Sequence, residues 1–449
     1  MVCAGKLRDL LYSPREVKML VRIFGRNYRS LKRAFELSMV AADLTRKEDR
    51  DRGVIELPIN GTDEQLRLLR TVAIYGANAS GKSTVLHAVR ALRWVGTDSS
   101  ARSKPHADIA PYEPFLLDEE SDKKPVSLGC DVYFNGAILR YEIEYEKKAI
   151  LREQMTILDG KREVKLIDRE PSGKVFGDLF KRGTANRLYV KGMQPNVAVL
   201  SKLAQHGPQA GDESVLPYYI AIRNATNHAD YSGAVMDFPG NKDRFADDPS
   251  YRDWVMDHLI RAADVGICDA KTRQEKLDFP EGFREGFAKL DSQLTFPEHM
   301  TIVSFVHEGI SKRPIEYMDE SSGTKKLFNV AANWWRLAHE PISIFADELS
   351  ASLHPRLLDG LVRSMNDARS VKSQLVFSTH DTGLLEARDG LPPALRRDQV
   401  YFSKKDAKGE SDLYSLAEFK EEARPVHNIR KRYLSGLYDA IPDVEKLSL

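Results

Sequence analysis

A glycine-rich segment in the first fifth of the chain has the residue types and spacing of a phosphate-binding loop. Residues 76–83 read Gly-Ala-Asn-Ala-Ser-Gly-Lys-Ser. Glycine lets the backbone curl until its N–H groups point at phosphate oxygens, and a helix beginning at Lys82 adds the positive end of its dipole. Lys82 would neutralise the β- and γ-phosphates of a nucleotide, and the Ser83 hydroxyl would ligate Mg²⁺.

The sequence on either side of this loop fits the same chemistry. Residues 71–75, TVAIY, form an apolar run typical of a buried strand, and VLHAVRALRWV after the loop has helical apolar spacing. A chance match to G-x-x-x-x-G-K-[ST] requires neither flank, so the context favours a true ATP site. The residues predicted to contact the nucleotide are Gly76, Asn78, Ala79, Ser80, Gly81, Lys82, Ser83 and Thr84.

Two later apolar runs end in residues that could act on a bound triphosphate. SIFAD at 343–347 ends in Asp347, which would hold Mg²⁺, and the adjacent Glu348 would polarise the attacking water as general base. QLVFST at 374–379 leads to His380, which could hydrogen-bond the γ-phosphate. An acidic turn or a lone histidine often has only a structural role. The catalytic prediction for these residues therefore depends on the order in which the segments occur along the chain.

A Ser-Gly turn lies between the phosphate loop and the acidic pair. Ser322 and Gly323 precede the helical pattern KKLFNVAANWW, and a helix N-terminus with exposed backbone N–H groups can bind an anion. Taken alone, such a turn is common. Phosphate loop, Ser-Gly helix, acidic strand and histidine strand together form a constellation that chance does not readily assemble.

Buried strands alternating with helices at both ends of the chain predict an α/β layered core. We expect an N-terminal half of an ATPase core at 19–96, an inserted strand-then-helix lobe at 97–300, and a C-terminal half at 301–449. Residues 41–70 are charged and suggest irregular chain, and 196–290 suggest mainly helix. The core would be a mixed sheet-and-helix P-loop ATPase head with a β/helical insertion.

Composition limits the function classes. The 449 residues are 42% hydrophobic and 30% charged, with a formal net charge of +1, which excludes a histone-like polycation. No apolar run is long enough for a membrane span, and no secretory signal is evident. The three cysteines are far apart, which disfavours disulfide frameworks and zinc knuckles and favours a reducing, cytoplasmic location.

The order of the four segments resembles the ABC-type ATPases of the SMC-like branch. GANASGKST is similar to the Walker A motif of that branch, ESSGT to its signature, IFADELSASLHP to its Walker B motif and D-loop, and FSTHDTGLL to its switch-histidine segment. More narrowly, the chain resembles AAA-family ATP-binding proteins of prokaryotic defence operons. These are the ATPase subunits of AbiL/RloA-type abortive-infection systems and, more distantly, the OLD and PARIS ATPases.

Further segments carry this narrower resemblance, which extends over most of residues 19–442. They are FGRNYRSLKRAFEL, IRAADVGI, LRRDQVYFSKKDAKGESDLYSL and KRYLSGLYDAIP. The sequence differs from the pattern of this family in two places. The signature reads ESSGTKK rather than LSGGQ, and no glutamine occurs between residues 98 and 125, where a lid glutamine of the family could lie.

The resemblance implies an ABC-type fold, ATP and Mg²⁺ as cofactors, and a homodimer or higher homo-oligomer. In such a dimer the signature of one copy covers the ATP of the other. It also implies an anti-phage role as sensor or regulator of a separate effector, a nuclease encoded nearby, with no membrane partner. A short-armed RecF/SMC-like DNA-binding repair ATPase is the alternative, because basic clusters at 22–33 and 430–432 leave nucleic acid open as a partner.

Overall fold

The computed structural model describes most of the chain. The described residues are 17–44, 51–180, 184–206, 214–230, 240–263, 266–277, 299–351, 353–368, 372–419 and 428–442. Two motif segments quoted above extend outside them, IRAADVGI at residues 264–265 and IFADELSASLHP at residue 352. No helix in the described ranges combines the length and the apolar character that crossing a membrane requires.

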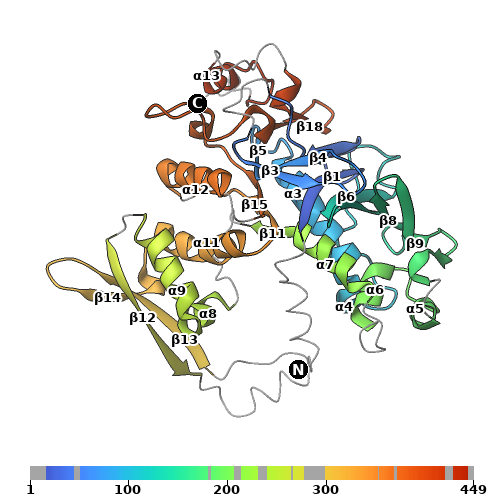
Figure 1. Cartoon of the computed structure of the whole chain (residues 1–449), viewed down its shortest axis with the longest axis horizontal. Coiled ribbons are helices and arrows are strands. Elements are labelled where there is room, and N and C mark those ends of the chain that lie inside the picture. Colours follow the sequence, from blue (N-terminus) through green and yellow to red (C-terminus); the bar gives the residue numbers. More distant parts are fainter. Residues whose placement is uncertain are drawn as a thin grey trace. The chain divides into compact units, whose positions relative to one another are not determined.

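The chain divides into two compact units, drawn in Figure 1. The first comprises residues 1–232, 337–351 and 358–449, and the second comprises 233–336 and 352–357. These limits differ from the expected division at 97 and 300. The reason is strand pairing, since residues 127–134 of β6 (Val126–Phe134) pair with β1 (Lys18–Arg26), and β6 therefore belongs to the first unit.

A six-stranded sheet carries the predicted nucleotide motifs. Its order is β11 (Asn227–Asp230), β15 (Ser343–Asp347), β16 (Gln374–Ser378), β5 (Thr71–Tyr75), β17 (Val400–Lys405) and β18 (Ser411–Ser415). The first five strands are parallel and only β18 is antiparallel to its neighbour. Every residue of β5, β15 and β16 is buried, as expected for parallel strands covered on both faces.

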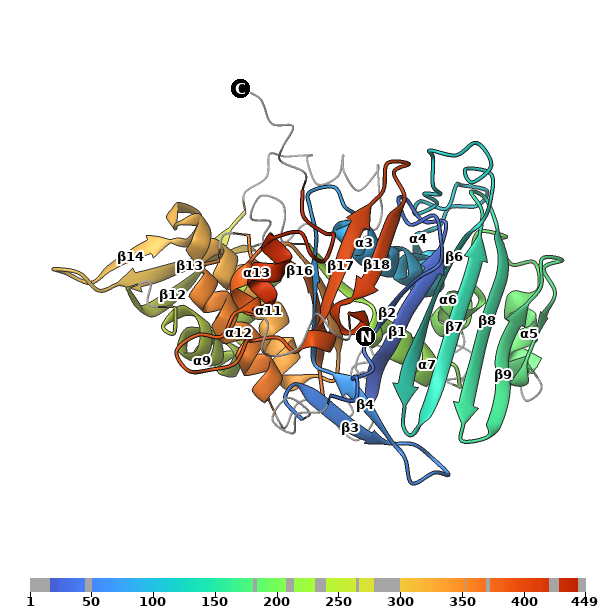
Figure 2. The same cartoon turned by 90° about the horizontal axis from the view of Figure 1, so that it is seen from above.

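A seven-stranded antiparallel sheet forms the other layer of the first unit, and Figure 2 shows most of its strands side by side. Its order is β10 (Val175–Phe176), β9 (Arg162–Arg169), β8 (Ile150–Asp159), β7 (Ala137–Tyr145), β6, β1 and β2 (Phe35–Ser38). A tight turn at Asn135-Gly136 joins β6 to β7, with φ of 50° and 91° at these residues.

Helices complete the two layers. They are α3 (Lys82–Arg93), α4 (Ser99–Arg102), α5 (Thr184–Val190), α6 (Val199–His206), α7 (Leu216–Ala225), α12 (Pro355–Asp367) and α13 (Ile429–Leu434). Helix α3 begins directly after the phosphate loop and contacts β11 and β15 of one sheet and β6 of the other. Its apolar side chains, among them Val85, Leu86 and Val89, are fully buried, which fixes the start of the helix in the core.

A buried glutamine ties the two sheets together. The Gln374 side chain at the start of β16 accepts the Leu20 N–H at 2.8 Å and donates to the Leu20 carbonyl at 3.0 Å. The same amide nitrogen donates to the Leu69 carbonyl at 3.2 Å. Gln374 is 0% exposed, so these bonds satisfy polar groups that would otherwise be costly to bury.

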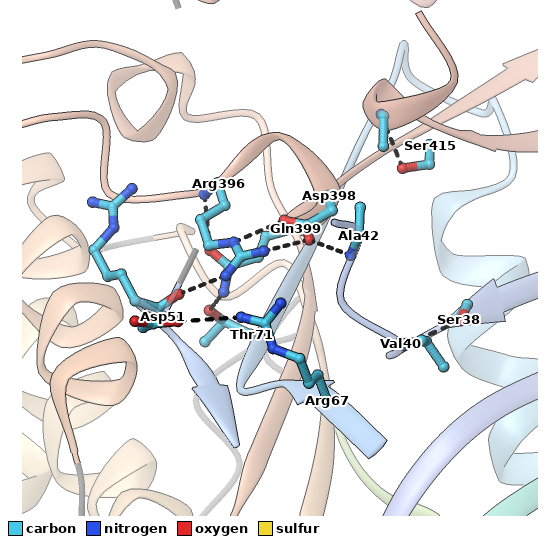
Figure 3. A network of polar contacts seen from close by, with 12 residues as sticks. Ser38, Val40, Ala42, Asp51, Arg67, Thr71, Arg396, Asp398, Gln399 and Ser415 are labelled. Atoms are coloured by element: carbon cyan, nitrogen blue, oxygen red, sulfur yellow. Dashed lines mark hydrogen bonds and ion pairs between the residues drawn. The ribbon is translucent and has the colours of Figure 1, made fainter. Parts of the chain in front are cut away.

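A second buried network joins the chain before β17 to the N-terminal segments. Arg396 and Asp398 form an ion pair with 2.7 Å between Nη2 and Oδ2, and their side chains are 0% and 4% exposed. The same Asp398 oxygen accepts the Ala42 N–H at 2.8 Å, as Figure 3 shows. Arg396 also donates to the Arg52 carbonyl. The carboxylate therefore neutralises a buried guanidinium and holds residue 42 in place.

The second unit has its own core. It contains α8 (Asn241–Asp247), α9 (Pro249–Val255), β12 (Ile267–Lys276), β13 (His299–His307), β14 (Arg313–Glu316) and most of α11 (Ser322–His339). The three strands form an antiparallel sheet in the order β12-β13-β14. Phe245, Phe305 and Phe328 pack edge to face, with ring centroids 5.2–6.3 Å apart.

One local expectation was wrong and another was incomplete. The chain at 41–70 is not irregular throughout, because β3 (Val54–Pro58) and β4 (Gln65–Leu69) form a hairpin there. The described part of 196–290 is mainly helical as expected, but it also contains the strands β11 and β12. Both are polar strands, and pairing with β15 and β13 rather than an apolar pattern defines them.

The Arg396–Asp398 pair generates a stability prediction. Asp398→Ala removes the carboxylate that forms the ion pair with the buried Arg396 guanidinium, which should lower the free energy of unfolding by about 3–5 kcal/mol. Asp108→Ala is the control, because Asp108 pairs with Lys147 in an exposed bridge and should cost at most about 1 kcal/mol. Denaturant unfolding measures both, and equal costs would contradict the assigned role of the network.

Candidate active site at the edge of the parallel sheet

The phosphate loop has a backbone that side chains would disrupt at two positions. Gly76 and Gly81 have φ of 154° and 115°, in the region that favours glycine, and Ala79 has φ of 59°. A Cβ at Gly76 would lie 2.3 Å from the Ser403 carbonyl oxygen, and one at Gly81 would lie 2.4 Å from the Ser411 Oγ. The loop therefore rests directly on the β17–β18 hairpin.

Serine hydroxyls form the floor of the loop. Ser403 and Ser411 both donate to the Ser80 carbonyl, at 3.0 Å and 2.7 Å. The Ser411 hydroxyl also lies 2.8 Å from that of Ser30, which in turn contacts Thr84 at 3.3 Å. The Ser80 Oγ is itself buried and has no hydrogen-bond partner among the described residues. A buried hydroxyl of this kind can bind a ligand oxygen.

Lys82 lies at the first position of α3 and is only 7% exposed. Its Nζ donates to the carbonyls of Gly76 at 3.0 Å and Ala77 at 2.9 Å. Burial lowers the pKa of this lysine, and the negative charges of Asp347 and Glu348 oppose the shift. The lysine and both acidic residues are therefore close enough to interact electrostatically at one edge of the sheet.

The acidic pair follows β15 as predicted. Asp347 is the last residue of the strand and 3% exposed. Its Oδ1 accepts the Ser378 hydroxyl at 2.5 Å, and the same hydroxyl accepts the Glu348 N–H at 2.8 Å. Glu348 has φ of 50°, a left-handed backbone, and is half-buried. The sequence analysis did not identify Ser378.

His380 follows β16 on the same edge of the sheet. Desolvation and the charge of Lys82 lower the pKa of its imidazole, and Glu348 opposes the shift. The ring is therefore mainly neutral near pH 7, with one N–H to donate. The next residue, Asp381, is fixed by its N–H bond to the Thr379 hydroxyl and by the bond from Tyr75 to its carbonyl.

These residues fit a magnesium nucleotide. Asn78 and Ala79 are exposed at the top of the loop, and Ser83 and Thr84 lie in the first turn of α3. The donor set combines backbone N–H groups, hydroxyls and an ammonium for phosphate, with an Asp carboxylate and a Ser hydroxyl for a hard cation such as Mg²⁺. Glycines that no Cβ can replace and the unpartnered Ser80 Oγ agree with a loop shaped around a ligand.

The predicted Ser-Gly turn lies in the second unit. Ser321 caps α11, because its Oγ accepts the Thr324 N–H at 3.1 Å. Ser322 is exposed and Gly323 is partly exposed in the first turn of the helix. The preceding Glu320 is buried and bonded to His307 at 2.6 Å. The phosphate loop belongs to the first unit, so the structure does not place Ser322 and Gly323 relative to it.

An aromatic cluster beside the phosphate loop was also missed by the sequence analysis. Tyr433 of α13 stacks on Phe402 with 5.5 Å between centroids and meets Tyr75 edge-on at 5.7 Å. Burial raises the pKa of Tyr433, and a hydrogen bond with the Gly76 backbone opposes the shift. The C-terminal helix therefore supports the strand and the first glycine of the loop.

Solved structures similar to the chain include three SMC heads. The SMC head domain from Thermotoga maritima is 12% identical, with 88% of this chain and 98% of that chain covered and a TM-score of 0.37. The Smc head domain with an extended coiled coil bound to the C-terminal domain of ScpA, derived from Pyrococcus furiosus, is 12% identical, with coverages of 94% and 100% and a TM-score of 0.39.

A third structure, the SmcHead bound to the C-winged helix domain of ScpA, is 13% identical, with coverages of 89% and 99% and a TM-score of 0.38. No curated protein matches the sequence.

The expected α/β fold is confirmed by the six-stranded, mainly parallel sheet that carries the phosphate loop and is accompanied by helices. The sequence matches a protein family over residues 72–188 and 215–386, more than half of its length. This match includes the phosphate loop, the acidic pair and His380. The chain therefore belongs to the AAA-domain family described as "AAA domain, putative AbiEii toxin, Type IV TA system".

Proposed function

We propose that this chain binds and hydrolyses ATP with Mg²⁺ and, as an ATP-dependent dimer, regulates a separate effector in anti-phage defence. The convergence of Lys82, Asp347 and Glu348 at one sheet edge carries the catalytic part of the proposal. Membership of a family described by an AbiEii toxin supports the defence part. In the abortive-infection reading the effector is a nuclease on another chain, in the cytoplasm.

The chemistry of the proposed reaction follows from the residues at that edge. Bound Mg²⁺, held by Ser83 and Asp347, would supply charge neutralisation at the phosphates. Lys82 exchanges its bonds to the loop carbonyls for the β- and γ-phosphates. Glu348 accepts a proton from the water that attacks the γ-phosphorus, as the bond to the bridging oxygen breaks and ADP leaves. Neutral His380 donates its N–H to the γ-phosphate.

A second copy would complete the site. A triphosphate carries more charge than one phosphate loop satisfies, and the exposed N-terminal turn of α11 at Ser322 and Gly323 offers further N–H groups. Supplied by a partner copy, these groups make ATP part of the interface, so that binding joins two chains and hydrolysis releases them. A dimer that closes in this way can transmit the nucleotide state to an effector.

The alternative, a RecF/SMC-like DNA binder, has less support. The basic residues at 22–33 that suggested a nucleic-acid face lie opposite carboxylates. The ion pairs are Arg22 with Glu36 and Asp131, Arg26 with Glu144, Arg29 with Glu113, Lys32 with Asp118 and Glu410, and Arg33 with Glu410. At the other cluster Arg430 pairs with Glu386. Neutralised pairs of this kind attract a polyanion weakly.

Lys82→Ala tests nucleotide binding. The variant should lose at least one charge-assisted hydrogen bond to phosphate, worth about 1.5–3 kcal/mol, which weakens ATP affinity roughly tenfold or more. Lys147→Ala, at an exposed lysine paired with Asp108, is the matched control and should bind normally. Calorimetric titration measures both, and wild-type affinity in the Lys82 variant would refute the assigned site.

Glu348→Gln tests hydrolysis and dimer closure together. Removing a general base should slow turnover by roughly 100- to 10,000-fold while ATP binding persists. Size-exclusion chromatography with ATP should then show a stable dimer. The Lys82→Ala, Glu348→Gln double variant should elute as it does without nucleotide. A Gln variant whose elution ignores ATP would argue against closure around the nucleotide.

Duplex DNA separates the two function classes. If the paired basic residues form an ordinary solvated surface, the wild-type rate of ATP hydrolysis should not respond to added duplex DNA. The Arg26→Glu, Arg33→Glu variant should hydrolyse ATP at the same rate with and without DNA. Stimulation of the wild type that this variant loses would instead favour the DNA-binding repair ATPase.

A further inference from the structure

One buried hydroxyl contacts both residues of the acidic pair. Ser378 is the last residue of β16 and is 0% exposed. Its Oγ lies 2.5 Å from Asp347 Oδ1 and 2.8 Å from the backbone nitrogen of Glu348. A carboxylate can only accept and an amide N–H can only donate. The single hydroxyl hydrogen therefore goes to Asp347, and a hydroxyl lone pair receives the Glu348 N–H.

The backbone of Glu348 needs such support. With φ of 50° it occupies the left-handed region, which costs a non-glycine residue stability. The Glu348 N–H donates to the Ser378 hydroxyl, and the Glu348 carbonyl accepts the Ala351 N–H at 2.9 Å. Bonds on both sides thus hold the strained turn.

This turn determines where the Glu348 carboxylate lies. In a continued strand, Asp347 and Glu348 would point to opposite faces of the sheet. Instead, the backbone turns left-handed at Glu348, with φ of 50°, and the N–H of this residue bonds to the Ser378 Oγ at 2.8 Å. The left-handed turn at Glu348 is therefore the backbone feature that departs from a continued strand and sets the direction of its side chain.

We propose that Ser378 is a positioning residue that orients both acidic side chains at once. Its donated hydrogen fixes one oxygen of Asp347 and leaves the other for Mg²⁺, and its accepted bond stabilises the turn that presents Glu348 to the attacking water. The inference rests on the proposed function and deepens it. Ser378 touches neither substrate nor metal and acts through the two carboxylates.

Ser378→Ala removes both hydrogen bonds with little change in volume. Displacing a catalytic group by about 1 Å can lower the rate of a reaction about 100-fold. We therefore expect kcat for ATP hydrolysis to fall by about that factor, while KM stays near the wild-type value. Loss of a partner that orients a metal-binding group typically weakens metal affinity about 10- to 100-fold. The Mg²⁺ concentration for half-maximal binding of a non-hydrolysable ATP analogue should therefore rise.

Two further variants separate positioning from packing. Ser378→Thr keeps the hydroxyl on a β-branched side chain suited to a strand and should restore kcat and Mg²⁺ affinity. Ser373→Ala is the matched control, because Ser373 is also a buried serine, 1% exposed, and its Oγ donates to the Leu337 carbonyl just before the same strand. It should lower thermal stability without changing kcat.

The outcomes distinguish this inference from the proposed function. If wild-type turnover is absent, or persists in Lys82→Ala, the proposed function itself fails. If turnover depends on Lys82 but Ser378→Ala matches Ser373→Ala in kcat and in Mg²⁺ dependence, the role of Ser378 is overturned. Should the alanine variant not fold, Ser378→Cys, a poorer donor of similar size, must show the same fall in kcat at unchanged KM.

Discussion

The electrostatic interaction between one buried lysine and two carboxylates depends on the order of strands in the parallel sheet. β16 lies between β5 and β15, and the carboxyl ends of all three strands meet at one edge. Lys82 enters at that edge with its charge largely removed from water, which would be costly without opposite charge nearby. Asp347 and Glu348 supply that charge. The same three groups carry the charges that the proposed magnesium triphosphate site requires.

Short hydroxyl side chains connect this edge to the rest of the first unit. Ser403 and Ser411 fasten the phosphate loop to β17 and β18, and Ser378 fastens the acidic pair to β16. A hydroxyl can donate and accept at the same time, so a single buried serine joins two backbone segments without burying a charge. The site is thus built from strand ends that small polar groups hold in place.

Much of this arrangement could be predicted from sequence because it depends on local patterns. The apolar runs TVAIY, SIFAD and QLVFST correspond to β5, β15 and β16, and the lysine, acidic and histidine residues at their ends lie where the spacing indicated. β11 could not be found in this way. Its four residues, NHAD, have no apolar pattern, and pairing with β15 alone defines the strand.

The sequence analysis also missed Ser378, Ser403, Ser411 and Tyr433, because their roles depend on contacts between distant segments. A buried serine at a strand end has no sequence signature, and only the three-dimensional pairing of β16 with β15 and of β17 with β5 gives Ser378 and Ser403 their partners. The boundary between the two units was equally hidden. The expected division at residue 97 fails because β6 pairs with β1, and these two strands are separated in sequence by the whole phosphate loop and its helix.

The floor of the phosphate loop has a consequence for biosynthesis. The Ser80 carbonyl accepts hydrogen bonds from the hydroxyls of Ser403 and Ser411. These two serines lie 323 and 331 positions further along the chain. A nascent polypeptide that has emerged only as far as the glycine-rich loop has nothing beneath Gly76 and Gly81 to hold their backbone. The ribosome must release the chain as far as Ser411 before the loop is fully supported, so contacts of long sequence separation should make maturation of the pocket a late and slow event.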